Sequence, residues 1–544
     1  MLSANSTVSE AQSLTQLHYL AWIAVGKYFA CLASRSPSRH ALLPQATQHI
    51  SSCIVLWSTL VSSRPCVTSQ ARRWREWAKQ YGPVVRCMGP VGKECIIFLS
   101  PEALQQIMVK DWLVYPRPQI MRDILELVAG SGLLTTTGDA HKRLRKAMNP
   151  AFSVPNLIAQ TDMYYEPIEG LVEILNRQIK GEAAPEAGKV FQMYHWMEKV
   201  TLDIICNTAF GYKIDCLHNP SNKLAVALEQ MLDLQSDRGW STWGGNAVIP
   251  GVAHALTSDW LYRHRNLVGK IPTLRPLSLL IDLLHRIRTI SREMLRAKTV
   301  DLSVAPEDMS TKKDIMSLMV RARKAELNAN PVSEAMSDMA MVDQVITFLV
   351  AGQEGPALGL SWTLWLLAND SESQCRLCEE VTPIYAANPR PDYRTLKSLE
   401  WLDCVANESL RVLPPIPQTF RVAEKTDYID GVLVPKGTMI NIPIRVINTW
   451  KQVWGEDAEE FHPARWLNLP KAYNPTFSQF SFLTGPHDCV GKTMAVSEMK
   501  AVLAALIANF EFAPAYAGQV AHPAAALSMK PDDNMPLHVS RIKA

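Results

Sequence analysis

A long apolar segment from Met336 to Leu367 constrains the fold of this chain more than any other feature. The polar residues Asp338, Asp343 and Gln344 gather near its start. A helix that is apolar on every side is buried on every side, because it must be covered by other elements. The sequence therefore predicts one long helix that crosses the core of a large domain.

The composition is compatible with such a core. Of the 544 residues, 47% are hydrophobic and 20% are charged, which is near the globular average and excludes a disordered chain or a polytopic membrane protein. The net charge of +3 gives no reason to expect a nucleic-acid partner. Eleven cysteines without regular spacing argue against a secreted disulfide scaffold and favour a reducing compartment.

Helical patterns dominate the rest of the chain, and strand-like segments are short. Further helices are predicted at 398–412 and 490–510. Strand-like segments are found at 84–87, 95–99, 428–433 and 439–442, and a terminal hairpin is expected at 530–537. Because no linker or repeat interrupts the chain after about residue 70, we expect a mainly α-helical single domain with small β-sheets at 64–544.

Residues 1–63 differ from the rest and predict an N-terminal membrane anchor. The apolar stretches Tyr19–Ala33 and Ile50–Val61 are each shorter than the roughly 20 residues that span a bilayer. Together they predict a segment that spans obliquely or lies partly in the interface. Four arginines at 64–75 follow, which by the positive-inside bias keeps the domain in the cytosol. A cleaved signal peptide is the alternative, since small residues at 30–33 could form a cleavage site.

One motif near the C-terminus carries distinctive chemistry: Phe482, Gly485, His487, Cys489 and Gly491 lie within ten residues that lead into a predicted helix. The free N–H groups of a helix N-terminus stabilise a thiolate. Gly485 permits a tight turn, and Gly491 lets the helix approach a flat ligand closely. Cys489 is thus a candidate axial ligand of haem iron, and His487 a candidate donor to an anionic group at the haem edge. The alternative is an ordinary buried cysteine on a loop.

The segment from Phe482 to Gly491 resembles the haem-binding loop of the cytochrome P450 family. Upstream, Glu408 and Arg411 match the family's Glu-x-x-Arg motif, and Arg465 matches the arginine that completes its buried ion-pair cluster. A second Glu-x-x-Arg, at 293–296, is a solvated helix pair by expectation. Only the Glu408 copy precedes a proline-rich turn, Arg465 and the cysteine in the right order. The resemblance implies a structural role for these three residues.

The resemblance also implies a fold and a cofactor. We expect a triangular helical prism with haem b between the long central helix and the loop that carries Cys489. His141, Arg145, Arg421 and His487 would hold the haem propionates. The family's usual Trp-x-x-x-Arg is altered here, because His141 replaces the tryptophan four residues before Arg145.

The long helix keeps the family's glycine and acid at Gly352 and Glu354 but departs from the family pattern at Gly355 and Pro356. Related enzymes usually have a threonine after the acid, whereas this chain has Gly355. We expect Gly352 to leave room for dioxygen and Glu354 to take part in proton supply. Pro356 removes a backbone donor from the helix and is expected to favour a kink. Without the threonine hydroxyl, protons must come through water, through Glu354 or from a substrate hydroxyl.

Three functions follow from this departure. The first, which we favour, is a monooxygenase that inserts one oxygen atom of O2 into a lipophilic small molecule such as a terpenoid or polyketide. The second is a peroxygenase, isomerase or dehydratase that does not use the O2 and NADPH cycle. The third is a haem-binding sensor without catalysis.

For the first function the resemblance implies an endoplasmic reticulum membrane protein that faces the cytosol. It also implies an external NADPH–cytochrome P450 reductase as electron donor, because no flavin-binding motif follows Cys489, and it allows cytochrome b5 as a second donor.

Overall fold

The computed structural model describes residues 66–88, 94–182, 184–236, 255–304, 314–329, 336–524 and 528–542. The anchor expected at 1–63 lies outside these residues. Within the described residues, no helix combines the length and the hydropathy needed to cross a bilayer.

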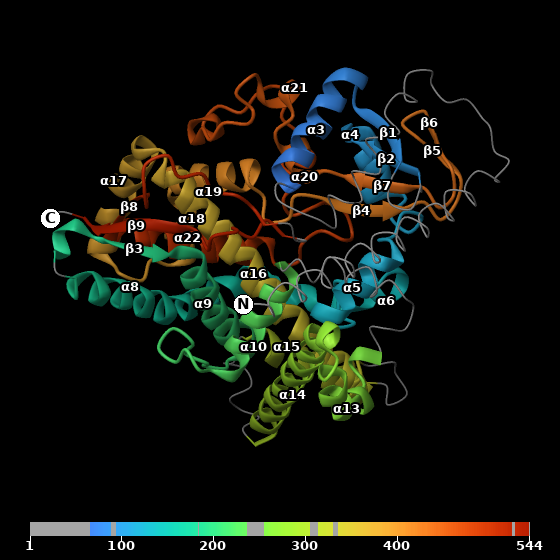
Figure 1. The fold of residues 1–544 in the computed structure, drawn as a ribbon, viewed down its shortest axis with the longest axis horizontal. Coiled ribbons are helices and arrows are strands. Elements are labelled where there is room, and N and C mark those ends of the chain that lie inside the picture. The colour runs from blue at the N-terminus through green and yellow to red at the C-terminus, as the bar shows by residue number, and fades with distance from the viewer. Residues whose placement is uncertain are drawn as a thin grey trace, which may run out of the picture.

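Helices dominate the fold (Figure 1). Before the central helix the chain forms α3 (Cys66–Tyr81), α4 (Pro101–Gln105), α5 (Gln119–Ala129), α6 (Gly138–Met148), α7 (Val154–Gln160), α8 (Tyr165–Lys180), α9 (Met193–Ile205), α10 (Lys223–Ser236), α13 (Asp259–Gly269), α14 (Arg275–Val304) and α15 (Ile315–Ala329). After it the chain forms α17 (Ser371–Ala387), α18 (Tyr393–Ser398), α19 (Glu400–Val412), α20 (Ile444–Asn448), α21 (Lys451–Trp454) and α22 (Lys492–Asn509).

The predicted central helix is confirmed as α16 (Asp338–Ala368). It begins where the Ser337 hydroxyl accepts a hydrogen bond from the Ala340 N–H at 3.2 Å, an N-cap that satisfies one free donor. Figure 1 shows α16 running through the middle of the molecule. Its N-terminal half packs into one apolar cluster with α10, α14 and α15, and its C-terminal half packs into another with α8, α17, α19 and α22.

Between Met341 and Leu364 the burial of α16 is interrupted only near its centre. Residues 341–350 and 357–364 are all buried, whereas Ala351 is exposed and Gly352, Glu354 and Gly355 are half-buried. A helix that is otherwise covered on every side therefore has an accessible section in the middle of the core.

Small sheets lie at the edges of the helical body. The larger one has the order β1 (Val84–Met88), β2 (Glu94–Phe98), β7 (Met439–Ile442) and β4 (Thr419–Val422), in which only β2 and β7 are parallel. A second, antiparallel sheet has the order β3 (Lys189–Gln192), β9 (Pro536–Arg541) and β8 (Phe510–Pro514). Strands β5 (Asp427–Ile429) and β6 (Val432–Val434) form a hairpin. The third apolar cluster lies between the larger sheet, α3, α4 and α20.

The structure corrects three element boundaries. Residues 428–433 are not one strand but the β5–β6 hairpin, because Asp430 and Gly431 have φ of +47° and +74° and turn the chain. The predicted helix 490–510 begins at Lys492 and ends at Asn509, and Phe510 starts β8. The segment 530–537 leads into β9, which pairs with β3 and β8 instead of closing on itself.

Candidate functional site

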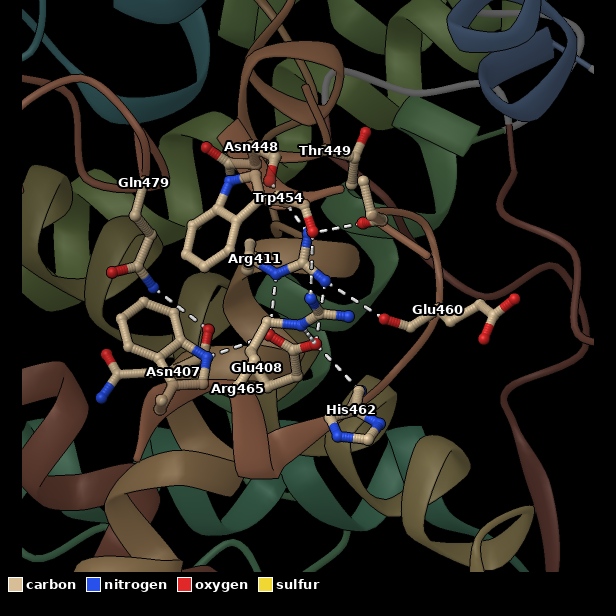
Figure 2. A network of polar contacts seen from close by, with 12 residues as sticks. Asn407, Glu408, Arg411, Asn448, Thr449, Trp454, Glu460, His462, Arg465 and Gln479 are labelled. Atoms are coloured by element: carbon tan, nitrogen blue, oxygen red, sulfur yellow. Dashed lines mark hydrogen bonds and ion pairs between the residues drawn. The ribbon is translucent and has the colours of Figure 1, made fainter. Parts of the chain in front are cut away.

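A buried ion-pair network holds the C-terminal end of α19 (Figure 2). Arg411 donates to both oxygens of Glu408, from Nε at 2.7 Å and from Nη2 at 2.8 Å. Arg465 Nε donates to Glu408 Oε1 at 2.7 Å. The His462 N–H and the Trp466 indole N–H each donate to the same carboxylate at 2.9 Å. Glu408 and Arg411 are fully buried, yet every charge has an opposite charge at bonding distance, as a buried ion pair requires.

Backbone acceptors and an aromatic ring complete this network, which we call the Glu408 network. Arg411 donates to the carbonyls of Asn448, Ala458 and Glu460. Its guanidinium also lies 4.7 Å from the centre of the Trp454 ring, a cation–π contact. The network thus fixes the chain from residue 448 to 466 against α19.

Polar contacts carry this rigidity to the loop that bears Cys489. Asn448 Oδ1 accepts from the Phe480 N–H at 2.6 Å, and Asn448 Nδ2 donates to Ser481 Oγ at 2.9 Å. Ser481 Oγ donates in turn to the Leu410 carbonyl at 2.7 Å. Figure 2 shows Gln479 pointing to the backbone of Asn407, to which it donates. The residues just before Phe482 are therefore held to α19.

The loop itself is a tight turn that needs glycine at one position. Gly485 has φ of +78°, and a Cβ there would lie 2.1 Å from the Met108 carbonyl oxygen. Any side chain would clash with backbone, so the expectation for Gly485 has a physical basis in both conformation and close approach. The Cys489 N–H donates to the Phe482 carbonyl at 2.9 Å and closes the turn. Gly491 is the N-cap of α22.

The surroundings of Cys489 differ from those we expected. The side chain is accessible, but packing around it raises the pKa of the thiol, mainly by desolvation. The Gly491 N–H, Arg145 and Lys492 lower it, as expected for a helix start, but they do not outweigh burial. The helix start alone therefore does not make Cys489 a thiolate. Coordination of a metal cation would deprotonate it.

Arg145 on α6 binds the same loop directly. Its Nη1 donates to the Asp488 carbonyl and its Nη2 to Asp488 Oδ1, both at 2.6 Å, while Nε donates to Asn149 Oδ1 at 2.9 Å. All three guanidinium nitrogens have partners in the protein. Contact of Arg145 with a propionate stays a prediction, and its visible role is to join α6 to the cysteine loop.

The ring of His487, on this loop, lies against the ring of His141 on α6, tilted by 40°. Their ring centres lie 3.9 Å apart, and Trp112 meets both rings edge-on, at 5.9 Å and 5.2 Å. Burial, assisted by nearby arginines, lowers the pKa of His141 to about 4 and that of His487 to about 2. Both rings are therefore neutral at physiological pH in this environment, and His141 Nδ1 has no hydrogen-bond partner among the described residues.

Two arginines, the half-buried Arg117 and the buried Arg421, complete a cluster of positive and neutral donors that lacks an anion. Arg117 donates to the Leu134 carbonyl, and Arg421 on β4 donates to Thr419 Oγ1 and the Phe420 carbonyl. Neither forms an ion pair with an acidic group of the described residues, and Arg421 Nη2 is buried without a partner. Desolvation lowers the pKa of Arg117 to about 10, and it lowers the pKa of Arg421 well below its ordinary value.

This donor set, Arg117, Arg421, His141 and His487, fits the anionic edge of a haem. Two adjacent guanidiniums without a counter-charge, one on the buried Arg421 and one on the half-buried Arg117, are costly unless an anion binds there. Arg421 Nη2 and His141 Nδ1 have no hydrogen-bond partner among the described residues, and two propionates would supply one to each. Because Cys489 is two residues from His487, a haem whose propionates bind this donor set could also meet the Cys489 sulfur.

The middle of α16 supplies the wall of the proposed haem site that faces the cysteine loop. Ring centres of Phe348 and Phe152 lie 5.7 Å apart, and Phe152 Cε1 is 3.8 Å from the position of a Cβ on Gly491. Phe152 therefore links α16 to the start of α22. Gly355 has open space where its side chain would be, and Ala351, one turn earlier on the same face, is exposed.

Gly352 has a different role from the one we expected. A Cβ on Gly352 would lie 2.5 Å from Ile205 Cγ1, so the glycine lets α9 and α16 pack closely. On this turn the accessible residue is Ala351. Pro356 continues the helix and lacks the N–H that would bond the Gly352 carbonyl.

Glu354 lies beside Gly355 and faces the C-terminal segment. Ser528 Oγ donates to Glu354 Oε1 at 2.5 Å. Burial raises the pKa of Glu354, while the Ser528 hydroxyl and the Lys530 ammonium lower it. A raised pKa keeps the proton on this carboxyl group to a higher pH than on an ordinary glutamate, which suits a proton donor.

Sequence reasoning missed Trp112, Arg117, Phe152 and Ser528. For Arg117 a weak signal existed, because the residue stands between Pro116 and Pro118 in a rigid segment. The other three are ordinary residue types in ordinary contexts. Only their contacts in the folded chain distinguish them.

Comparison with known proteins agrees with this geometry. The family model for cytochrome P450 matches residues 64–536. The chain is 30% identical to cytochrome P450 monooxygenase sphH of Aspergillus fumigatus, over 80% of this chain and 78% of that protein. It is 30% identical to cytochrome P450 monooxygenase 205 of Postia placenta, over 80% of each chain, and 27% identical to cytochrome P450 monooxygenase claO of Ampulloclitocybe clavipes, over 81% of each.

The fold, the family match across most of the chain and the fungal relatives therefore agree. The chain belongs to the cytochrome P450 family of monooxygenases, whose members bind haem through a cysteine thiolate.

Proposed function

We propose that this enzyme inserts one oxygen atom of O2 into a lipophilic small molecule, with Cys489 as the axial ligand of its haem. The observation that carries the proposal is the cysteine loop, which the Glu408 network holds in place and which ends at an accessible sulfur. A thiolate-ligated haem supplies the activation of O2 when it is bound. As the family resemblance implies, a secondary metabolite such as a terpenoid or polyketide is the proposed substrate class.

The chain's own residues would take distinct parts. Arg117, Arg421, His141 and His487 would bind the propionates and orient the cofactor. Phe152 and Phe348 pack between the two walls and would exclude water from one side. Glu354 would hold a proton next to the open face of α16, where Gly355 leaves space for substrate or water.

Electrons would come from a separate NADPH–cytochrome P450 reductase, with cytochrome b5 as a second donor. The exposed basic side chains Lys142 and Lys146 on α6 and Lys492 at the start of α22 support this partner. Arg145 joins α6 to the cysteine loop, so these charges lie near the proposed ligand. Basic groups there would steer an acidic flavoprotein surface.

We also propose that residues 1–63 anchor the enzyme in the endoplasmic reticulum membrane and that 64–544 is the catalytic domain on the cytosolic side. Two apolar stretches followed by arginines support the orientation. The family match, which begins at residue 64, supports the boundary.

Carbon monoxide tests the ligand assignment. The reduced protein with carbon monoxide should show the strongly red-shifted Soret band of thiolate ligation, and Cys489→Ser should abolish it. Cys375→Ser is the matched control, because Cys375 is also exposed but lies on α17. A shifted band that survives in Cys489→Ser would exclude this cysteine.

Labelled oxygen tests the reaction. Purified enzyme, reductase and NADPH under ¹⁸O2 should convert a lipophilic component of extracts from the source to a product that carries one labelled atom. Product without label would refute the monooxygenase assignment.

One observation favours the second candidate, a peroxygenase, isomerase or dehydratase. Gly355 has no hydroxyl, and beyond its own turn of helix no heavy atom of the described residues lies within 4 Å of the position that a Cβ would take there. If the enzyme never consumes NADPH but converts an organic hydroperoxide, this candidate is correct. Gly355→Thr should fold normally, because the space is open. An increase in NADPH-coupled turnover in this variant would show that the hydroxyl limits the native enzyme.

A further inference from the structure

Polar side chains of the C-terminal segment bind Glu354 and an exposed acid of α10. Ser528, which donates to Glu354, is 3% exposed. Two residues later Lys530 is 7% exposed, and its Nζ lies 2.7 Å from Asp233 Oδ1. The Asp233 side chain is 64% exposed. Two residues of one short segment, Ser528 and Lys530, therefore join Glu354 to the exposed Asp233.

Helix α9 adds a second buried acid beside Glu354. Tyr194, Glu198 and Thr201 follow at helical spacing, so they lie on one face of α9. Thr201 Oγ1 donates to the Gln353 carbonyl at 3.0 Å, which holds this face against α16 one residue before Glu354. Glu198, one turn earlier, is 6% exposed, and within the described chain its Oε1 has no hydrogen-bond partner.

Lys530 lies between the two acids. Its Nζ is 5.3 Å from the centre of the Tyr194 ring, and its charge acts on both Glu198 and Glu354. Burial raises the pKa of Glu198 to about 7, and the Lys530 ammonium opposes this rise. The other ionisable groups that face Glu198 are Tyr194, Glu229 and Glu354. Glu198 can therefore gain and lose a proton near physiological pH.

We propose that Glu198 and Ser528 form a proton relay that reloads Glu354 from solvent, with Lys530 as its positioning residue. The inference rests on the proposed function, since it assigns a source to the protons that Glu354 delivers. Ser528 passes its hydroxyl proton to the Glu354 carboxylate and regains one, through water, from the carboxyl group of Glu198. Solvent on the Asp233 side returns the proton to Glu198, so each cycle moves one proton inward and leaves the side chains unchanged.

This relay also accounts for the altered motif on α16. Related enzymes have a hydroxyl in the residue after the acid, and this chain has Gly355 there. Ser528 places a hydroxyl on the same carboxyl group from a different part of the chain. Lys530 is held by Asp233, so its charge stays fixed between Glu198 and Glu354.

Infrared difference spectroscopy on the full-length, haem-loaded protein tests the relay without turnover. The wild type should show a protonated-carboxyl band that disappears as the pH is raised through about 7 and is absent in Glu198→Gln. Glu498→Gln is the matched control, because Glu498 on α22 is 1% exposed and its Oε1 is likewise unpartnered in the described chain. Lys530→Met should raise the midpoint pH of the band by about one unit, because a cation is lost.

A wild-type protein without such a band, or a midpoint that Lys530→Met leaves unchanged, would overturn the relay. A band that persists in Glu198→Gln and disappears in Glu498→Gln would overturn it as well.

Oxygen consumption with NADPH and reductase, and no added organic compound, is the second test. Release of peroxide needs one NADPH (O2 + NADPH + H⁺ → H2O2 + NADP⁺), whereas reduction to water needs two (O2 + 2 NADPH + 2 H⁺ → 2 H2O + 2 NADP⁺). Proton delivery through Glu354 favours water. Glu198→Gln and Ser528→Ala should therefore raise the ratio of peroxide to water by about tenfold, and Glu498→Gln should leave it unchanged.

The two proposals fail differently. If the wild type consumes no NADPH, the monooxygenase function is refuted, and the infrared experiment still decides the relay. If the wild type consumes NADPH and Glu198→Gln gives the same product ratio as Glu498→Gln, the relay is refuted and the function stands.

Discussion

The two buried charge clusters on either side of the cysteine loop are opposites. In the Glu408 network two guanidiniums share the Glu408 carboxylate, and backbone carbonyls and the Asp457 carboxylate take remaining donors. In the second cluster, formed by Arg117, Arg421, His141 and His487, Arg421 is buried and Arg117 is half-buried. Neither arginine has an acidic partner among the described residues, and donor atoms are left over. The first cluster is complete within the protein and so stabilises the fold. The second is incomplete and so indicates a place where an anion binds.

The largest expected effect comes from breaking the complete cluster. Glu408→Gln leaves two buried guanidiniums without their carboxylate, which should lower the free energy of unfolding by about 3–5 kcal/mol. Denaturant unfolding measures this loss. Glu460→Gln is the control, because only the backbone carbonyl of Glu460 meets Arg411. Equal stability of the two variants would show that the network is not structural.

Glu198, whose Oε1 has no hydrogen-bond partner among the described residues, should give a pH-dependent effect on stability of intermediate size. Burial raises the pKa of Glu198 from its ordinary value to about 7, so the folded protein holds a proton that the unfolded chain releases above about pH 4.5. Stability should therefore fall as the pH is raised from about 4.5 to 7. Glu198→Gln removes this penalty and should be roughly 2–3 kcal/mol more stable relative to the wild type at pH 8 than at pH 4. A pH-independent difference between the two proteins would contradict the assignment.

A substitution in the second cluster should weaken haem binding more than it lowers the stability of the fold. Arg421→Met removes a buried charge that lacks a partner, so the fold itself should lose little. The haem would lose a propionate donor, and its dissociation rate to a haem scavenger should rise by about tenfold. The exposed Arg394→Met on α18 serves as the control. An unchanged dissociation rate would mean that Arg421 does not hold the propionates.

The smallest effect is expected at the contact between Arg145 and Asp488. These side chains are 20% and 44% exposed, and such pairs contribute about 1 kcal/mol or less. Asp488→Asn should therefore lower the free energy of unfolding by no more than this amount, and added salt should reduce the difference. A loss as large as that in Glu408→Gln would place this pair among the structural contacts.

The predicted parts of the molecule are those that depend on neighbours in sequence. The apolar run that became α16 needs no knowledge of its partners, because a segment without a polar face can only be buried. The choice of Glu408 over Glu293 rested on order along the chain. The structure agrees in that Glu293 and Arg296 are exposed on α14, whereas Glu408 and Arg411 are fully buried.

The missed parts depend on residues far apart in sequence. Gly352 was expected to leave room at the centre of the site, but the nearest obstacle is Ile205, which comes from another helix. The hairpin at 428–433 was missed because its pattern is too short for periodicity to resolve. The hydrogen-bond partner of Glu354 could not be predicted either, since Ser528 lies 174 residues away in the sequence.

The sequence by itself determined that this chain forms a large helical domain with one buried central helix and a cysteine loop of the cytochrome P450 type. Periodicity and local motifs are sufficient for both, because each is set within a few turns of the chain. Only the tertiary structure decided which charges are neutralised and which are left for a ligand. Burial and distance set the energy of a charge, and both arise only when distant segments pack together.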